Sequence, residues 1–219
     1  MSGSQDGRRH SRDDVSEMAL RLLDEYGLPD LTMRHIANAL EVRASALYWH
    51  FPNKQALLAA VSARILRPME DVRVEEMTVS EAVRRLGARL RECLLAYRDA
   101  AELVSSSLAL GLVDSPIRPQ LLAVTRRDEV PDPLARVAAE AVMHFVVGYT
   151  FHEQQRLTAD SFGLLPEDAS LNPDDVSASP SDAGEFEEAL TMIADGLEVV
   201  SASARAGARP GPDGRAESS

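Results

Sequence analysis

The chain has 219 residues, of which 45 % are hydrophobic, and no apolar run reaches the length of a membrane span, so we expect a soluble protein with a sizeable core. The N-terminus lacks the apolar core of a signal peptide and the single cysteine, Cys93, cannot form an internal disulfide, which favours the cytoplasm. The net charge of −12 argues against a nucleic-acid partner, but residues 1–55 carry only −1 of it and the remainder −11.

Residues 1–10 are rich in glycine, serine and arginine, and we expect them to be disordered. The arginines Arg8, Arg9 and Arg12 either contact phosphate or a minor groove, or remain solvated; the composition favours a solvated tail. Ser11 with Asp14 predicts the start of a first helix. This helix ends at Gly27, and its inward residues recur at helical spacing: Val15, Ala19, Leu22, Leu23 and Tyr26.

Residues 31–54, LTMRHIANALEVRASALYWHFPNK, predict two short helices around a tight turn. Thr32 is the expected cap of the first helix, residues 33–40, and residues 41–42 form the turn. The second helix, residues 43–50, is too short to be stable without docking on other elements. This is the helix-turn-helix arrangement, in which the second helix enters the major groove of DNA.

From ALRLLDEYGLPDLTMRHIANALEV through ALYWHFPNKQALL, residues 19–58 closely resemble the tetracycline-repressor (TetR) family of bacterial transcription regulators. The run from Leu47 to Lys54 is especially close to tetracycline repressors proper. The resemblance implies an all-α fold, with an N-terminal three-helix helix-turn-helix DNA-binding head joined to a helical ligand-binding and dimerisation body. Glu41 stands where many members have glycine; if this position needs a positive φ, glutamate costs about 1 kcal/mol.

The start of the second helix should face base edges through Arg43, Ala44, Ser45 and Ala46. Arg43 is best suited to a bidentate contact with guanine, worth on the order of 1–3 kcal/mol of discrimination. Ala44 and Ala46 offer only methyl contacts, and tetracycline repressors carry larger polar residues there, so we expect a different operator. Arg34 is a further base or phosphate candidate. The other candidates suit phosphate contact, and each could instead be only a cap, a packing residue or a surface residue: Thr32, Tyr48, Trp49, His50 and Lys54.

The remaining sequence predicts further helices. Asn53 is the expected cap of a helix that ends before Pro68, with an apolar face of Leu57, Leu58, Val61, Ile65 and Leu66. Thr78 with Glu81 forms a capping box, which opens a helix with the inward stripe Val83, Leu86, Leu90, Leu94 and Tyr97. Cys93 lies in this stretch and is expected to be buried.

Later helices are expected at residues 100–112 and from Ser115-Pro116 onward, where proline occupies the first turn. The longest helix, residues 134–157, is apolar nearly all round from Val137 to Phe151, which predicts burial on every side. The last helix, residues 185–203, carries the stripe Phe186, Leu190, Ile193, Leu197 and Val200. Its pairing with helix 134–157, in its own and a second subunit, predicts a four-helix dimer interface, as the resemblance also implies.

These elements divide the chain into two domains flanked by tails. We expect a disordered tail at 1–10, the DNA-binding domain at 11–68 and the ligand-binding and dimerisation domain at 69–204. A Ser/Pro/Asp-rich stretch, residues 158–184, reads as a flexible loop inside the second domain, and residues 205–219 as a disordered tail.

The body also resembles the tetracycline-repressor C-terminal domain, in LLAYRDAAELV and HFVVGYTFHEQ, which implies a small-molecule effector that shifts the heads off DNA. In an alignment with tetracycline-binding members, Val104 stands where they have the metal-binding histidine. Their other drug-contacting positions are occupied here by Leu86, Leu90, Ser107, Leu108 and His152. We therefore expect no magnesium site, metal or cofactor, but a more apolar organic ligand. The polar residues able to anchor it are Ser105, Ser107, His144, Tyr149, His152 and Glu153.

His144 and His152 share one helix stripe, and three interpretations remain open: pocket wall, dimer seam, or hydrogen-bonded core histidines. HEQQR at residues 152–156 lacks the second histidine of the zinc-protease motif. With no catalytic motif, the sequence predicts no enzyme but a cytoplasmic, dimeric repressor that binds a palindromic operator and is released by a small organic ligand, with no membrane partner. The alternative is a helical protein-interaction module of the same fold without specific DNA binding.

Overall fold

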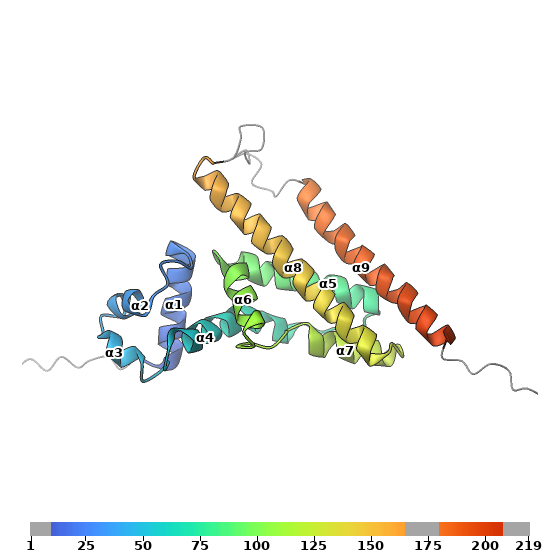
Figure 1. Ribbon diagram of the computed structural model, residues 1–219, viewed down its shortest axis with the longest axis horizontal. Helices are drawn as coiled ribbons and strands as arrows, with labels where there is room; N and C mark the ends of the chain where they lie inside the picture. Colours follow the sequence, from blue (N-terminus) through green and yellow to red (C-terminus); the bar gives the residue numbers. More distant parts are fainter. Residues whose placement is uncertain (1–9, 165–179, 208–219) are drawn as a thin grey trace, which may run out of the picture. The chain divides into compact units, whose positions relative to one another are not determined.

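The computed structural model describes residues 10–164 and 180–207, and their regular structure consists of helices (Figure 1). The all-α prediction is confirmed. In chain order the elements are α1 (Arg12–Tyr26), α2 (Met33–Ala39), α3 (Ala44–Leu47), α4 (Lys54–Leu66), the 3-10 helix η1 (Arg67–Asp71), α5 (Val79–Leu95), α6 (Ala100–Ala109), α7 (Arg118–Arg127), α8 (Asp132–Ser161) and α9 (Pro180–Gly207).

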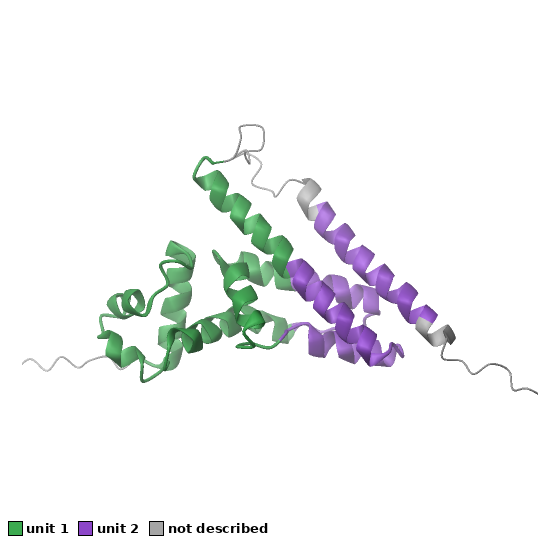
Figure 2. Cartoon of the chain, viewed as in Figure 1, with its two compact units in different colours: residues 1–71, 90–114, 147–171 green, residues 72–89, 115–146, 172–219 purple. Residues whose placement is uncertain are grey.

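The described chain forms two compact units, and each draws on separate stretches of sequence (Figure 2). Unit 1 combines α1 to α4 with α6, the C-terminal part of α5 and the C-terminal part of α8. Unit 2 combines the remaining parts of α5 and α8 with α7 and α9. The units thus cut across the predicted division after residue 68, because α4 packs against α6 as well as against α1.

Local capping explains where several helices begin. Ser11 and Asp14 form a reciprocal capping box on α1, and Thr78 and Glu81 do the same before α5. Asn53 caps α4 by accepting the Ala56 amide at 2.8 Å. These caps satisfy amides that a helix end leaves without intrahelical partners, and all three were predicted from the sequence.

The helix bounds near the predicted loop and tail differ from expectation. α8 includes residues 158–161 and α9 starts at Pro180, so part of the predicted loop 158–184 is helical; residues 165–179 lie outside the described part. α9 likewise continues to Gly207, into the predicted tail 205–219. Of the predicted tails, 1–9 and 208–219 lie outside the described residues. Amino-acid composition indicates where a loop is favoured, but it does not fix the residue at which a helix ends. A helix that is packed on its neighbours can continue into a stretch whose composition favours a loop.

Unit 2 is held by close packing of α9 on α5 and α8. Leu190 of α9 lies so close to Gly87 of α5 that a β-carbon there would meet the leucine side chain at 2.7 Å. Phe186 stacks on Phe145 of α8 with ring centroids 5.5 Å apart. The buried stripe of α9 consists of Phe186, Leu190, Ala194, Leu197 and Ser201. Val200, predicted in that stripe, is 50 % exposed, because the stripe drifts by one position along a straight helix.

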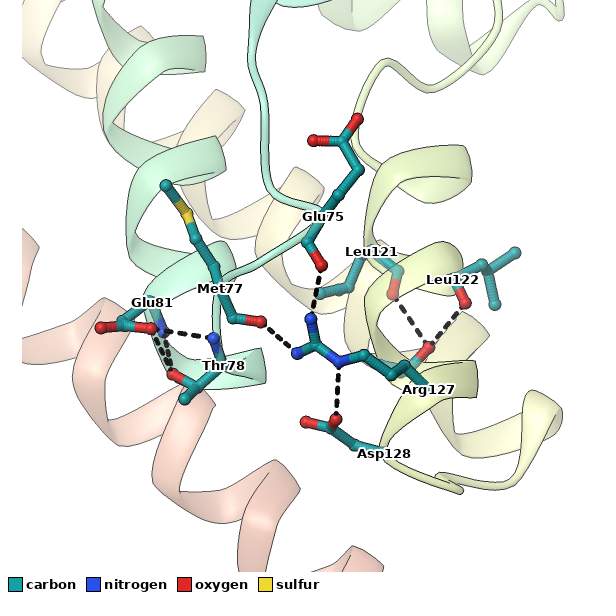
Figure 3. Close-up of polar contacts among 9 residues, drawn as sticks. Glu75, Met77, Thr78, Glu81, Leu121, Leu122, Arg127 and Asp128 are labelled. Carbon is teal, nitrogen blue, oxygen red and sulfur yellow. Dashed lines mark hydrogen bonds and ion pairs between the residues drawn. The ribbon is translucent and has the colours of Figure 1, made fainter.

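Arg127 at the end of α7 secures the segment that leads into α5. Its guanidinium donates to the carbonyls of Glu75 and Met77 and to the Asp128 carboxylate, beside the Thr78–Glu81 capping box (Figure 3). The hydrogen bond from the Thr78 amide lowers the pKa of the Glu81 carboxyl below its ordinary value.

The start of α7 differs from the prediction. The helix begins at Arg118 rather than at Pro116, and the Ser115 hydroxyl accepts a hydrogen bond from the Arg118 amide.

Candidate functional site

The turn between α2 and α3 is closed by backbone hydrogen bonds at the end of α2. The Thr32 hydroxyl caps α2 by accepting the His35 amide at 3.1 Å. At the other end, the Val42 amide donates to the Ala37 carbonyl at 2.9 Å, and Glu41 has a φ of 57°. Glu41 therefore does occupy the left-handed conformation that favours glycine, at a cost of about 1 kcal/mol, and the helix-turn-helix forms despite it.

Helix α3 is shorter than predicted. It spans Ala44–Leu47, with Arg43 as its N-terminal flanking residue and no side-chain cap, and residues 48–50 form a turn instead of continuing the helix. Leu47 and Phe51 are fully buried and fix α3 on the rest of the unit. The chain turns at 48–50 because the amides of both His50 and Phe51 donate to the Leu47 carbonyl.

The residues predicted to contact DNA gather around α3 and face solvent. Trp49 is 90 % exposed and Tyr48 is 51 % exposed, although Leu47 beside them is buried. Large aromatic side chains left in water mark surfaces that take a partner. Of the predicted set, Ala44 and His50 are half-buried, and the exposed members are Thr32, Arg34, Arg43, Ser45, Ala46, Tyr48, Trp49 and Lys54.

The start of α4 offers positive charge next to this surface. Lys54 is exposed in the first turn of α4, directly after the Asn53 cap. A helix N-terminus carries a partial positive charge and free amides, so an anion is favoured there. Lysine at this position adds a full positive charge. Free helix amides together with a lysine ammonium group form a suitable site for a DNA phosphate.

Two buried serines join α4 to α6. The Ser62 and Ser107 hydroxyls lie 2.8 Å apart and are hydrogen-bonded, and neither residue is more than 1 % exposed. Ser107 was predicted as a ligand anchor; in this structure its hydroxyl already has a protein partner. The pairing spans 45 positions in the sequence and had no local signal.

The turn between α5 and α6 contacts the C-terminal end of α1. The Asp99 carboxylate accepts the Leu28 amide at 2.9 Å, and Asp24 accepts the Arg98 amide at 3.1 Å. Asp99 has a φ of 54°, and Gly27 opposite it has a φ of 83°. A β-carbon on Gly27 would lie 2.7 Å from the Asp99 carboxylate oxygen, so any other residue there would force Asp99 away from its hydrogen bond with Leu28, in addition to straining the backbone.

Gln154 of α8 holds the same turn from the other helix. Its amide nitrogen donates to the carbonyls of Leu94 and Tyr97 at 2.9 and 2.8 Å, and its oxygen accepts the Ala101 amide at 3.1 Å. One buried side chain thereby satisfies backbone groups at the end of α5 and the start of α6. Sequence reasoning missed Gln154, since only the tertiary structure brings residues more than 50 positions apart together.

The predicted ligand-binding residues fall into both units. Leu86 and His144 belong to unit 2, and the other eight belong to unit 1. Among the unit 1 members, Leu90 and Val104 are fully buried, Leu108 and Tyr149 are half-buried and His152 is exposed. Glu153 forms a bidentate ion pair with Arg91 at 3.0 and 2.6 Å, so its charge is already balanced. Ligand roles for these residues remain predictions.

Two parts of the chain match known protein families. Residues 17–61 match the model of bacterial regulatory proteins of the tetR family, and residues 74–201 match the tetracyclin repressor-like C-terminal domain. The chain belongs to the tetR family. As a TetR-family member it is a DNA-binding, ligand-responsive transcription regulator. The two matched segments lie on either side of the predicted domain division after residue 68.

Individual relatives agree with this assignment. The regulator is 32 % identical over 154 residues to the class D tetracycline repressor of Escherichia coli, covering 69 % of this chain and 70 % of that protein. The crystal structure of Mycobacterium smegmatis BioQ has a TM-score of 0.75 and 36 % identity, covering 87 % of this chain and 98 % of BioQ. A BioQ structure with its double-stranded DNA operator has a TM-score of 0.69 and 35 % identity, covering 86 % and 98 %.

Proposed function

We propose that this TetR-family regulator is a repressor that binds a palindromic operator as a dimer and leaves it when a small organic ligand binds. The observation that carries the DNA-binding part is the solvent-facing cluster around α3, in which Tyr48 and Trp49 are exposed beside the buried Leu47. The similarity to BioQ, a protein crystallised with its operator, supports the same kind of partner.

Base recognition would depend on a small number of polar groups. Arg43 flanks the N-terminus of α3 and Arg34 lies on α2, and both are exposed and able to hydrogen-bond guanine. Ser45 is exposed between Ala44 and Ala46, which offer only methyl groups to thymine. We therefore propose an operator whose half-sites are selected mainly by guanine contacts, with phosphate contacts from Tyr48 and other exposed residues setting the register.

Dimerisation through α8 and α9 is supported by apolar residues that unit 2 leaves exposed. On α9, Met192 is 74 % exposed and Val199 66 %; on α8, Val137 is 65 % exposed. The expectation that Val137 to Phe151 is buried on every side is therefore wrong for the single chain. The exposed face of α8 runs through Val137, Ala141, His144 and His152, spaced at three, four or eight positions as in a helix-packing seam. A second copy of the chain would cover it, and this favours the dimer-seam interpretation of the two histidines.

The effector would be an organic molecule other than a tetracycline–magnesium complex. Val104 is buried and has no metal-ligating atom, and Ser107 and Glu153 are engaged with Ser62 and Arg91. A ligand in this body would therefore bind mainly by apolar contacts with a few polar ones. The protein would act in the cytoplasm, where its operator lies; α8 is apolar and long enough to cross a membrane by composition alone, but core helices of soluble bundles share this property.

Selection of tight-binding duplexes from a random DNA pool tests the proposed function. The enriched duplex would then be titrated by fluorescence anisotropy with the native protein, Arg43→Ala and Lys54→Ala. We expect a palindrome, relaxed base preference at one position for Arg43→Ala, and uniformly weaker binding with a smaller salt dependence for Lys54→Ala. If no sequence is enriched over scrambled DNA, the repressor proposal is wrong and the interaction-module alternative gains support.

A further inference from the structure

The start of α1 is attached to both turns that flank α3. His10 hydrogen-bonds through its Nε2 atom to the Leu40 carbonyl at 3.2 Å, at the turn between α2 and α3. The Arg12 guanidinium lies over the Phe51 ring, 4.8 Å from its centroid, at the turn between α3 and α4. Two separate contacts therefore place the first residues of α1 at the corner of the unit that carries the α3 surface.

Arg12 keeps its charge available for a partner. Among the described residues no carboxylate is paired with it, and its acidic neighbours are engaged elsewhere: Asp13 pairs with Arg64, and Asp14 caps α1 by accepting the Ser11 amide. Arg64, by contrast, is paired with both Asp13 and Glu17. In a head with nearly balanced charge, a guanidinium without an acidic partner is a strong point of attraction for a polyanion.

The cation–π contact with Phe51 positions the Arg12 guanidinium without using its hydrogen-bonding capacity. A cation–π contact is an electrostatic attraction to the ring and uses none of the five N–H donors of the guanidinium as a hydrogen bond to oxygen, so these donors remain available. Those donors match the geometry of a phosphate, which arginine can bind through two parallel hydrogen bonds. Phe51 is fully buried, so the ring is a fixed support rather than a mobile one.

The corner already contains two of the predicted phosphate contacts. Phe51 follows Tyr48 by three residues and precedes Lys54 by three, and both of these side chains are exposed. Lys54 lies in the first turn of α4, where the helix dipole favours an anion. Arg12 thus adds a third side chain able to bind phosphate, from a helix outside the helix-turn-helix.

We propose that Arg12 is a phosphate-binding residue of the DNA interface, pre-positioned by its cation–π contact with Phe51 and by the hydrogen bond of His10 to Leu40. This inference rests on the proposed DNA-binding function and adds a sequence-independent contact to it. On a two-fold symmetric operator the dimer would make the contact twice, once beside each α3.

The test compares Arg12→Ala, Arg12→Lys and the control Arg21→Ala by anisotropy titration on the selected operator and on a scrambled duplex, at several salt concentrations. Arg21 is also an exposed arginine of α1, but nine residues on it lies on roughly the opposite side of the helix, because each residue turns the helix by about 100°. Circular dichroism of each variant checks that the fold is retained.

We expect Arg12→Ala to weaken binding to both duplexes by a similar factor, on the order of tenfold, and to lower the salt slope by about 0.9 for each protomer. Arg12→Lys should keep the slope and lose part of the affinity, and Arg21→Ala should match the native protein. If Arg12→Ala and Arg21→Ala bind alike with the native slope, or if Arg12→Ala weakens only the operator, the proposal is wrong. Salt-dependent operator binding by the native protein tests the proposed function separately.

Discussion

The hydrogen bond between Ser62 and Ser107 gives a quantitative prediction. Both residues are fully buried and their hydroxyls are 2.8 Å apart, so changing one to alanine leaves the other hydroxyl without its partner. An unsatisfied buried polar group costs about 1–3 kcal/mol, and a serine in a helix can recover part of this by bonding a carbonyl one turn back. We therefore expect each single variant, Ser62→Ala and Ser107→Ala, to lose about 1–2 kcal/mol of unfolding free energy.

The double variant should lose much less than the sum of the two single losses, because no hydroxyl then remains unsatisfied. Thermal unfolding at one fixed protomer concentration is the assay, and about 1 kcal/mol corresponds to a shift of about 2–4 °C for a chain of this size. Ser105→Ala is the matched control, since Ser105 is exposed on the same helix and should change stability by less than about 0.5 kcal/mol. Additive losses, or a Ser107→Ala variant as stable as the control, would contradict this account and return Ser107 to the ligand-binding candidates.

Three further predictions concern other parts of the chain. Gly27→Ala should destabilise the protein by more than the roughly 1 kcal/mol expected for Gly111→Ala in urea unfolding, because both glycines have positive φ but only Gly27 lacks space for a β-carbon. The lowered pKa of Glu81 means that its capping contact stabilises the fold above the ordinary carboxyl pKa and is lost as the pH falls through the lowered value. NMR titration should find this pKa low in the native protein and only partly restored in Thr78→Ala, which removes the hydroxyl donor but keeps the backbone amide that donates to Glu81. Met192→Glu should shift the protein from dimer to monomer in analytical ultracentrifugation while circular dichroism remains helical, and an unchanged dimer would exclude this face of α9 from the interface.

Features set by neighbouring residues could be predicted from the sequence. Thr32 and Asn53 were assigned as caps because their side chains act on amides two or three positions away. Tyr26 shows the limit of this approach: helical spacing predicted it inward, yet it is 44 % exposed and its ring lies 5.0 Å from that of His35. The prediction was wrong because the spacing pattern cannot tell the last turn of a helix, which extends past its partners, from the middle.

Features that join distant segments had no signal in the sequence. Gln154 contacts residues 53 to 60 positions away, and Asp99 contacts Leu28 across 71 positions. Both residues lie in the stretches that resemble the tetracycline-repressor C-terminal domain, but the resemblance assigned them no role, because their roles depend on backbone groups that only the folded chain brings near. The attachment of Arg12 to Phe51 is of the same kind: composition favoured a solvated arginine, whereas the aromatic ring fixes its position.

The central claim is that two α3 surfaces, related by a two-fold axis, bind two half-sites of one operator at the same time. It is tested most directly by inserting five base pairs at the centre of the selected palindrome and titrating both duplexes with the native protein at physiological salt. Since half a helical turn places one half-site on the opposite face of the duplex, we predict that affinity falls to about the level of a single half-site. Equal affinity for the native and the expanded duplex would contradict the dimeric account.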